Sequence, residues 1–274
     1  MRWLTLPVAL LAAAAVLMLG QTAPPNAAGV SGGHVHLYAA DPAKMQQLLI
    51  DVLGGTKATS GTLNMVKFPG MFIAVGQRAE PGGGNDGSAI GHIGFYVKSF
   101  ADVKAKATAA GLGFRELTPN IQAFVTFPGD IVVEVQEDAS VGNNPAVFNH
   151  FHMNATDTEA TRQWYLKEFG GVDTERRKNN KGAGVPGVIV DFLPAGGRGK
   201  APAAPLTPTK GRAMDHIGFE VKDLKAFTDK LQADGVKLDM AVTDLTSKNG
   251  LKIAFITDPN GAYIELTEGL NKVQ

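Results

Sequence analysis

The chain has 274 residues, of which 44% are hydrophobic, and it carries 26 basic and 26 acidic side chains. This is enough apolar material for one large domain or two modest ones, and it argues against an intrinsically disordered chain. A formal charge of zero gives no basic field that would attract nucleic acid or an anionic membrane, so we expect a small-molecule partner. The absence of cysteine excludes disulfides, thiol nucleophiles and cysteine-ligated zinc.

The N-terminal segment has the organisation of an export signal. Arg2 precedes an apolar run from Trp3 to Leu19, and the small, proline-rich stretch QTAPPNAAGV follows. This order predicts a signal peptide within residues 1–28 and export to the periplasm or the medium, with no membrane contact after cleavage. An uncleaved membrane anchor is the alternative, because the run approaches the about 20 residues that span a bilayer.

The rest of the chain contains four histidine-led segments with one shared pattern. They are HVHLYAADPAKMQQLL from His34, HIGFYVKSFADVKAKA from His92, HFHMNATDTEATRQWY from His150 and HIGFEVKDLKAFTDKL from His216. Seven residues after each histidine stands a side chain that caps helix N-termini: Asp41, Ser99, Asp157 and Asp223. Each predicted helix ends near glycine, and short strand-like runs with turn residues follow. Each unit therefore predicts the order β-α-β-β-β.

The four units differ in how they end, which suggests how they pair. The second and fourth end alike, in AFVTFPGDIVVEVQE from Ala123 and AFITDPNGAYIELTE from Ala254, whereas the first and third end differently. We therefore expect an α+β fold with two domains of two consecutive units each. These domains span residues 29–140 and 148–274, with a small, polar linker at residues 141–147.

Histidines and carboxylates recur on the predicted strands. They are His34, His92 and Glu134 in the first half and His150, His216 and Glu265 in the second. Two neutral imidazoles and one carboxylate bind Fe, Mn, Ni or Zn ions and leave positions open for substrate or water. Asp191, in GVIVDFLP, is placed to add a fourth ligand in the second half, and its counterpart Ala74 cannot ligate. The alternative is that these are ordinary strand residues, a satisfied histidine or a solvent-facing glutamate.

Two further histidines, His36 and His152, form a second class. Each lies two residues after an anchor histidine, so its side chain returns to the same face of the strand. They are candidates for general acid/base catalysis, with hydrogen bonding to ligands or lining of the pocket as the alternative. The aromatic residues of the third helix have the spacing of a core face and are expected to pack inside: Trp164, Tyr165 and Phe169.

These features resemble the vicinal oxygen chelate superfamily, which includes glyoxalase I, extradiol dioxygenases, fosfomycin resistance proteins and bleomycin-binding proteins. The similarity covers nearly all of the chain after the signal segment. It is most specific in MDHIGFEVKDLKAF, from Met214, and TDPNGAYIELTEG, from Thr257. The resemblance implies glyoxalase/dioxygenase-like domains, in which paired βαβββ units form curved mixed sheets around a cleft. It also implies a divalent metal ion held by residues of the first and last strands of the units.

Carried onto this sequence, the resemblance implies one site with His150, His216, Glu265 and Asp191 as ligands. A second, degenerate site would contain His34, His92 and Glu134. The implied function is a metal-dependent lyase, isomerase or dioxygenase whose small substrate is chelated through neighbouring oxygens. Two alternatives stay open: a non-catalytic protein that sequesters an antibiotic or metabolite, and a protein that uses metal only for structure.

Overall fold

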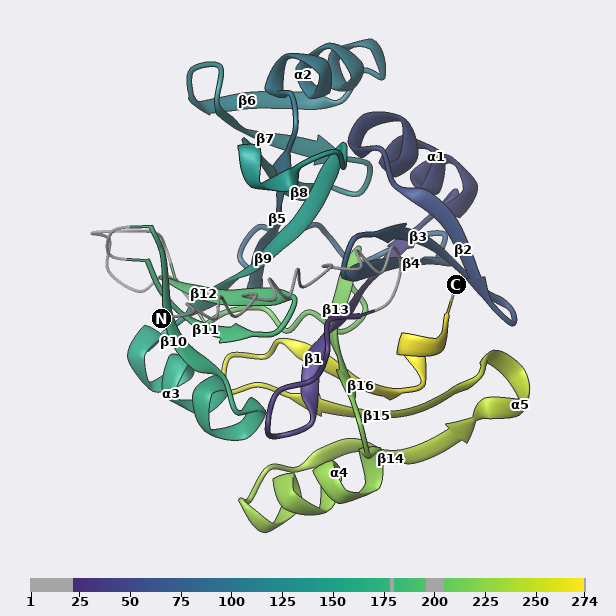
Figure 1. Ribbon diagram of the computed structural model, residues 1–274, viewed down its shortest axis with the longest axis vertical. Helices are drawn as coiled ribbons and strands as arrows, with labels where there is room; N and C mark the ends of the chain where they lie inside the picture. Colours follow the sequence, from purple (N-terminus) through teal and green to yellow (C-terminus); the bar gives the residue numbers. More distant parts are fainter. Residues whose placement is uncertain (1–21, 178–179, 196–204, 274) are drawn as a thin grey trace, which may run out of the picture.

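The computed structural model describes residues 22–177, 180–195 and 205–273, and Figure 1 shows how its helices and strands are arranged. The apolar run of the predicted signal peptide lies outside the described residues. Within the described ranges, no helix combines the length and apolar character needed to cross a bilayer. The predicted α+β class is confirmed, because the chain forms two eight-stranded mixed sheets with few helices.

Each of the four units has the predicted order of elements. The first comprises β1 (Val30–Ala39), α1 (Pro42–Leu53), β2 (Thr56–Ser60), β3 (Leu63–Phe68) and β4 (Met71–Gln77). The second comprises β5 (Ile90–Val97), α2 (Phe100–Ala109), β6 (Gly113–Thr118), β7 (Gln122–Phe127) and β8 (Ile131–Glu137). The third comprises β9 (Ala146–Ala155), α3 (Thr158–Phe169), β10 (Val172–Arg177), β11 (Asn180–Val185) and β12 (Val188–Pro194). The fourth comprises β13 (Met214–Val221), α4 (Leu224–Ala233), β14 (Leu238–Leu245), α5 (Thr246–Asn249), β15 (Leu251–Thr257) and β16 (Tyr263–Glu268). Two short 3-10 turns are η1 (Ala139–Val141) and η2 (Leu270–Lys272).

The four predicted helix caps are confirmed. Asp41, Ser99, Asp157 and Asp223 each accept a hydrogen bond from the backbone N–H three residues further on. Such a bond satisfies one of the free donors of the first helical turn. The change from strand to helix is therefore encoded locally, and it occurs at the same place in every unit.

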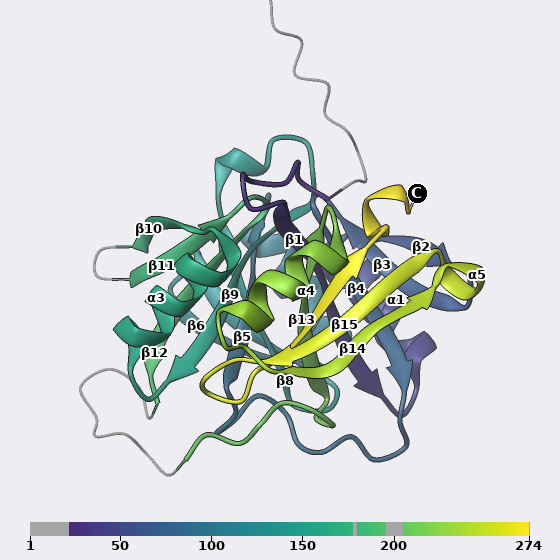
Figure 2. The same ribbon diagram turned by 90° about the horizontal axis from the view of Figure 1, so that it is seen from below.

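The pairing of the units differs from the prediction. One sheet has the order β14-β15-β16-β13-β1-β4-β3-β2, and the other has the order β10-β11-β12-β9-β5-β8-β7-β6. The first unit therefore shares a sheet with the fourth, through antiparallel β1 and β13, and the second shares a sheet with the third, through β5 and β9. Figure 2 shows the first-unit and fourth-unit strands side by side in one sheet. The prediction that the first unit pairs with the second, and the third with the fourth, is wrong.

The main hydrophobic core covers one face of each sheet and leaves the histidines on the other. Along β1, Val35 and Leu37 lie in the core, whereas His34 and His36 point to the opposite face. The same alternation holds in β9, where Phe151 is a core residue between two histidines. As predicted, the third helix packs its aromatic face inside; Phe169 is fully buried, and its ring centroid lies 4.5 Å from that of Phe219 in β13. This contact joins elements of the two sheets.

A buried carboxyl near this core gives the stability of the protein a testable pH dependence. Asp258 accepts a hydrogen bond from the Tyr165 hydroxyl and two from the backbone of its own turn. Burial raises the pKa of Asp258 to about 6. Because the folded-state pKa lies above the ordinary value, protonation favours the folded state, and this contribution is lost as the pH rises through 6.

We therefore expect the unfolding free energy of the wild type to gain about 1 kcal/mol, relative to Asp258→Asn, when the pH falls from 7 to 5. Urea denaturation of both proteins at the two pH values measures this difference. An identical pH response in the wild type and the variant would show that Asp258 does not titrate in this range.

Candidate metal centres

The first centre consists of His34 from the first unit and His216 and Glu265 from the fourth unit, which lie in one sheet. Glu265 Oε2 lies 3.0 Å from His34 Nε2 and 2.7 Å from His216 Nε2. One donor atom from each residue lies within 4.8 Å of the other two, and all three residues are buried. Both imidazoles thus direct the same type of nitrogen at one carboxylate oxygen, as the ligands of a single cation do.

A second carboxylate orients one of these imidazoles. Asp215 Oδ1 lies 2.6 Å from His216 Nδ1, on the side of the ring away from Glu265. A carboxylate in this position holds the ring of a metal-binding histidine and makes its other nitrogen a better ligand. Burial lowers the pKa of His216, but Asp215 and Glu265 on either side of the ring raise it to about 9. The surroundings of His216 therefore favour positive charge between the ring and Glu265.

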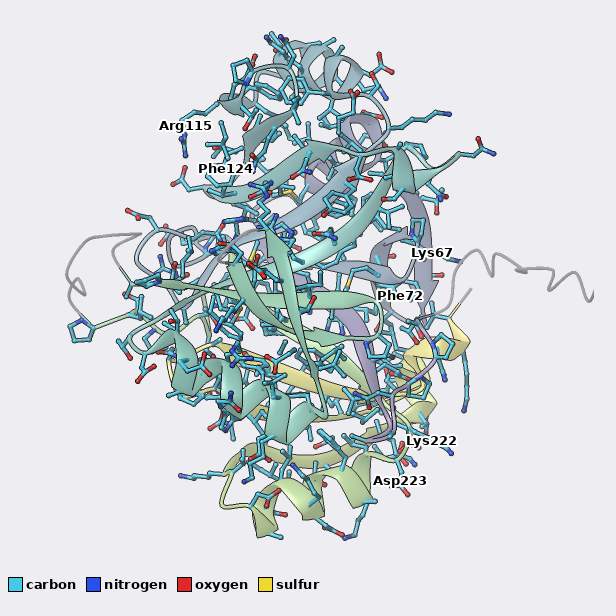
Figure 3. The ribbon with its side chains drawn as sticks, turned by 60° about the vertical axis from the view of Figure 1, so that its left-hand side comes forward. Lys67, Phe72, Arg115, Phe124, Lys222 and Asp223 are labelled. Carbon is cyan, nitrogen blue, oxygen red and sulfur yellow. The ribbon has the colours of Figure 1, made fainter. Side chains whose placement is uncertain are left out.

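Among the residues that the structure describes, none supplies a fourth ligand to the first centre. In every unit, the residue two positions after the first-strand histidine pairs with the ligand position on the last strand. The four pairs are Gly218 with Glu265, Gly94 with Glu134, His152 with Asp191 and His36 with Ala74. The register thus confirms that Ala74 is the counterpart of Asp191. Ala74 belongs to a small apolar cluster with Phe72, whose place on β4 is labelled in Figure 3.

His36 lies beside the first centre as a neutral base. Its ring centroid is 4.8 Å from that of His216, and its buried Nε2 has no hydrogen-bond partner among the described residues. Burial, and then the neighbouring His216, lower the pKa of His36 to about 3. The ring is therefore neutral at pH 7, and its predicted role in proton transfer stays a prediction.

The second centre consists of His92, His150, Glu134 and Asp191, with His152 beside them. His92 Nε2 lies 3.2 Å from Glu134 Oε2 and 3.4 Å from His150 Nε2. His152 Nδ1 lies 2.9 Å from Asp191 Oδ1, and its ring stacks on that of His92 with the centroids 4.4 Å apart. All five side chains are buried. The donor types are those of a metal site, as they are in the first centre.

An arginine is bound within the second centre. Arg176 Nε donates to Asp191 Oδ2 at 2.7 Å, and Arg176 Nη1 donates to Glu134 Oε1 at 3.1 Å. Only 2% of the Arg176 side chain is exposed. Both carboxylates therefore already have a cationic partner. The donor atoms that lie within 4.8 Å of one another at this centre are those of three imidazoles, His92, His150 and His152.

Each centre depends on a glycine in the repeated sequence HIGF. Gly218 on β13 faces His34 on β1, and a Cβ atom added there would lie 2.1 Å from His34 Cε1. Gly94 faces His150 in the same way, with a separation of 1.8 Å. The ring of the partner strand's histidine thus fills the space that a side chain would need.

The residues predicted from the sequence all line one of the two centres, but their grouping was wrong. His150 was assigned to the site of His216 and Glu265, and His34 to the site of His92 and Glu134. Instead, His34 joins His216 because β1 pairs with β13, and His150 joins His92 because β9 pairs with β5. Sequence reasoning also missed five residues that shape the centres: Asp215, Arg176, Arg177, Gly94 and Gly218. The repeated HIGF was the one available signal, since it marks the two glycines.

Comparisons with known proteins agree with this architecture. The sequence profile of the Glyoxalase/Bleomycin resistance protein/Dioxygenase superfamily matches residues 147–266. The crystal structure of glyoxalase I from Zea mays aligns with a TM-score of 0.67 and 14% identity, over 89% of this chain and 94% of that one. A candidate dioxygenase from Bacillus subtilis subsp. subtilis str. 168 aligns with a TM-score of 0.64 and 14% identity, over 91% of this chain and 86% of that one. No curated protein sequence matched the chain.

At this level of identity the structural likeness shows the fold, and the sequence profile covers residues 147–266, which contain the third and fourth units. The fold match over 89% of the chain agrees with the four βαβββ units described above. Residues 147–266 therefore match the glyoxalase/bleomycin resistance protein/dioxygenase superfamily, also called the vicinal oxygen chelate superfamily, and the chain as a whole has the fold of glyoxalase I.

Proposed function

We propose that the protein is a metal-dependent enzyme whose divalent ion is held by His34, His216 and Glu265. The observation that carries this proposal is the convergence of two imidazole nitrogens on one buried carboxylate oxygen, with Asp215 holding the outer nitrogen of His216. This donor set suits Fe, Mn, Ni or Zn ions. With three protein ligands rather than four, the set is typical of catalytic sites that keep a position for substrate or water.

The chemistry of such an ion suits a small substrate with two neighbouring oxygens. A bound ion would act as a Lewis acid that stabilises negative charge on those oxygens. Ala74 stands where Asp191 stands in the second centre and cannot ligate, and the His36 Nε2 atom has no hydrogen-bond partner within the described part of the chain. His36 is thus placed to accept or return a proton in a lyase, isomerase or oxygenase reaction.

Aromatic and cationic side chains near the first centre favour a substrate that carries negative charge. The Tyr263 ring lies 5.9 Å from that of His216, and Lys210 Nζ lies 4.7 Å from the Tyr263 ring centroid. The Arg78 guanidinium lies 4.2 Å from the ring centroid of Tyr38, whose ring packs against that of His36. Tyr38 is on the same face of β1 as His34 and His36. These two cations stand where an anionic substrate group would be attracted.

The proposal is tested by the metal content of the purified protein and two ligand variants. We expect the wild type to hold its ion through gel filtration, and His216→Ala and Glu265→Gln to lose at least about 10-fold in metal affinity, because each lacks one of three ligands. Elemental mass spectrometry of the eluted protein measures this.

His36→Gln is the control, since it changes a neighbouring residue that is not a ligand. We expect this variant to keep its metal and to lose turnover. Equal metal content in the wild type and both ligand variants would overturn the assignment of the site. Ligand binding that is unaffected by chelators would support the sequestration alternative.

A further inference from the structure

The second centre retains more potential ligands than the first. Two histidines, His92 and His150, occupy the positions of His216 and His34, and both last-strand positions carry a carboxylate, Glu134 and Asp191. The first centre has alanine at one of these positions. Judged by donor type alone, the second centre would be the better metal site of the two.

Arg176 supplies the positive charge at this centre. Its guanidinium bridges the two carboxylates, with one N–H donated to Asp191 and another to Glu134. Arg177 adds a second contact, from Nη2 to Glu134 Oε1 at 3.1 Å. Because an arginine side chain stays protonated, its charge is permanent and repels a divalent ion from the same place.

The local backbone explains why Arg176 reaches the centre. The pairing of β10 with β11 shifts register between Glu175 and Arg177, which places Arg176 at a bulge. A bulge re-aims side chains and is frequent beside functional sites. The equivalent hairpin of the first unit, β2 with β3, pairs without a shift and ends in Ser60, whose hydroxyl bonds to the backbone of Asn249. The first centre has no corresponding cation from this hairpin.

An aromatic ring and a further arginine also lie near His92 of the second centre. The Phe124 ring lies 4.8 Å from that of His92, and the Arg115 guanidinium lies 5.0 Å from the Phe124 ring centroid. Figure 3 shows Arg115 and Phe124 together on this part of the molecule. The imidazole of His92 thus packs against the rings of both Phe124 and His152.

We infer that Arg176 takes the place of the metal ion at the second centre, so that this centre is a metal-free internal ion pair. Its two carboxylates and two histidines stay in ligand positions, and the guanidinium is hydrogen-bonded to both carboxylates. Replacement of Arg176 by a neutral residue of similar length therefore creates a metal site where the wild type has none.

The test is a titration of chelator-treated protein with Zn(II), in which bound zinc per chain is measured after gel filtration. Arg176→Met is expected to bind one zinc ion more than the wild type, and Arg176→Met/His92→Ala is expected to lose that additional ion. Arg177→Met is the matched control: it removes the adjacent, partly exposed cation and is expected to leave the stoichiometry unchanged. A folded Arg176→Met protein with the wild-type stoichiometry overturns the inference.

A second measurement covers the case in which Arg176→Met does not fold without metal. His92→Ala in the wild-type background is expected to leave zinc binding unchanged, and loss of a zinc ion there overturns the inference. A different result is expected if the proposed metal site at the first centre is wrong. The wild type would then bind no zinc, while Arg176→Met would still bind one ion that depends on His92.

Discussion

Gly218→Ala is expected to remove metal binding from the first centre with only a moderate loss of stability. The added methyl group would lie 2.1 Å from Cε1 and 2.2 Å from Nδ1 of His34, so the imidazole must leave its place beside Glu265. Loss of a correctly placed ligand should weaken metal affinity by about 100-fold or more. Overpacking at one strand position should lower the unfolding free energy by about 1–3 kcal/mol. Zinc titration and urea denaturation measure the two effects separately.

Gly94→Ala is the matched control for this prediction. It stands in the same HIGF sequence, and its methyl group would lie 1.8 Å from Cε1 of His150 in the second centre. We expect a comparable loss of stability with unchanged metal affinity. If Gly94→Ala lost the metal and Gly218→Ala kept it, the assignment of the two centres would be reversed.

Phe169→Ala is expected to destabilise the whole protein by about 3–5 kcal/mol, because it empties a large cavity in the main core. Phe169 is fully buried at the end of α3, and its ring packs against Tyr165 in its own helix and against Phe219 and Phe227 of the fourth unit. Its contacts therefore link the unit that carries His150 to the unit that carries His216. Equilibrium unfolding followed by circular dichroism measures the loss.

The nearby Val172→Ala variant is the control, since the Val172 side chain is 66% exposed and its truncation leaves no cavity. We expect it to change the unfolding free energy by less than about 0.5 kcal/mol. A Phe169→Ala protein as stable as this control would mean that the two sheets do not share one core.

The internal organisation of each unit could be predicted because it is encoded locally. A capping side chain seven residues after the histidine ends a strand and starts a helix, and Asp41, Ser99, Asp157 and Asp223 all do so. The alternation of histidine with apolar residues also indicated the correct face of β1 and β9. Both signals act over a few residues and depend little on the rest of the fold.

Local sequence signals did not predict which two units pair in one sheet. The first and third units begin His-X-His, and the second and fourth begin His-X-Gly, so a histidine ring of one type needs a glycine of the other type opposite it. This rule allows the first unit to pair with either the second or the fourth. The pairing that forms is decided by contacts between distant segments, such as Phe169 with Phe219, which have no local sequence signal.

The role of Arg176 was hidden for a related reason. In the sequence it is one of two adjacent arginines in a polar stretch, ERRKNN, which is typical of an exposed hairpin. Only the bulge in β10 and the proximity of β8 bring it to Glu134. A buried cation that replaces a metal ion is therefore visible in the structure and not in the spacing of the ligands.

The most direct test of the central claim is anomalous diffraction from crystals of the protein grown with Zn(II). We predict one strong anomalous peak among His34, His216 and Glu265, and density for the Arg176 guanidinium between Glu134 and Asp191. A peak among His92, His150 and His152, with none at His34, would contradict the account.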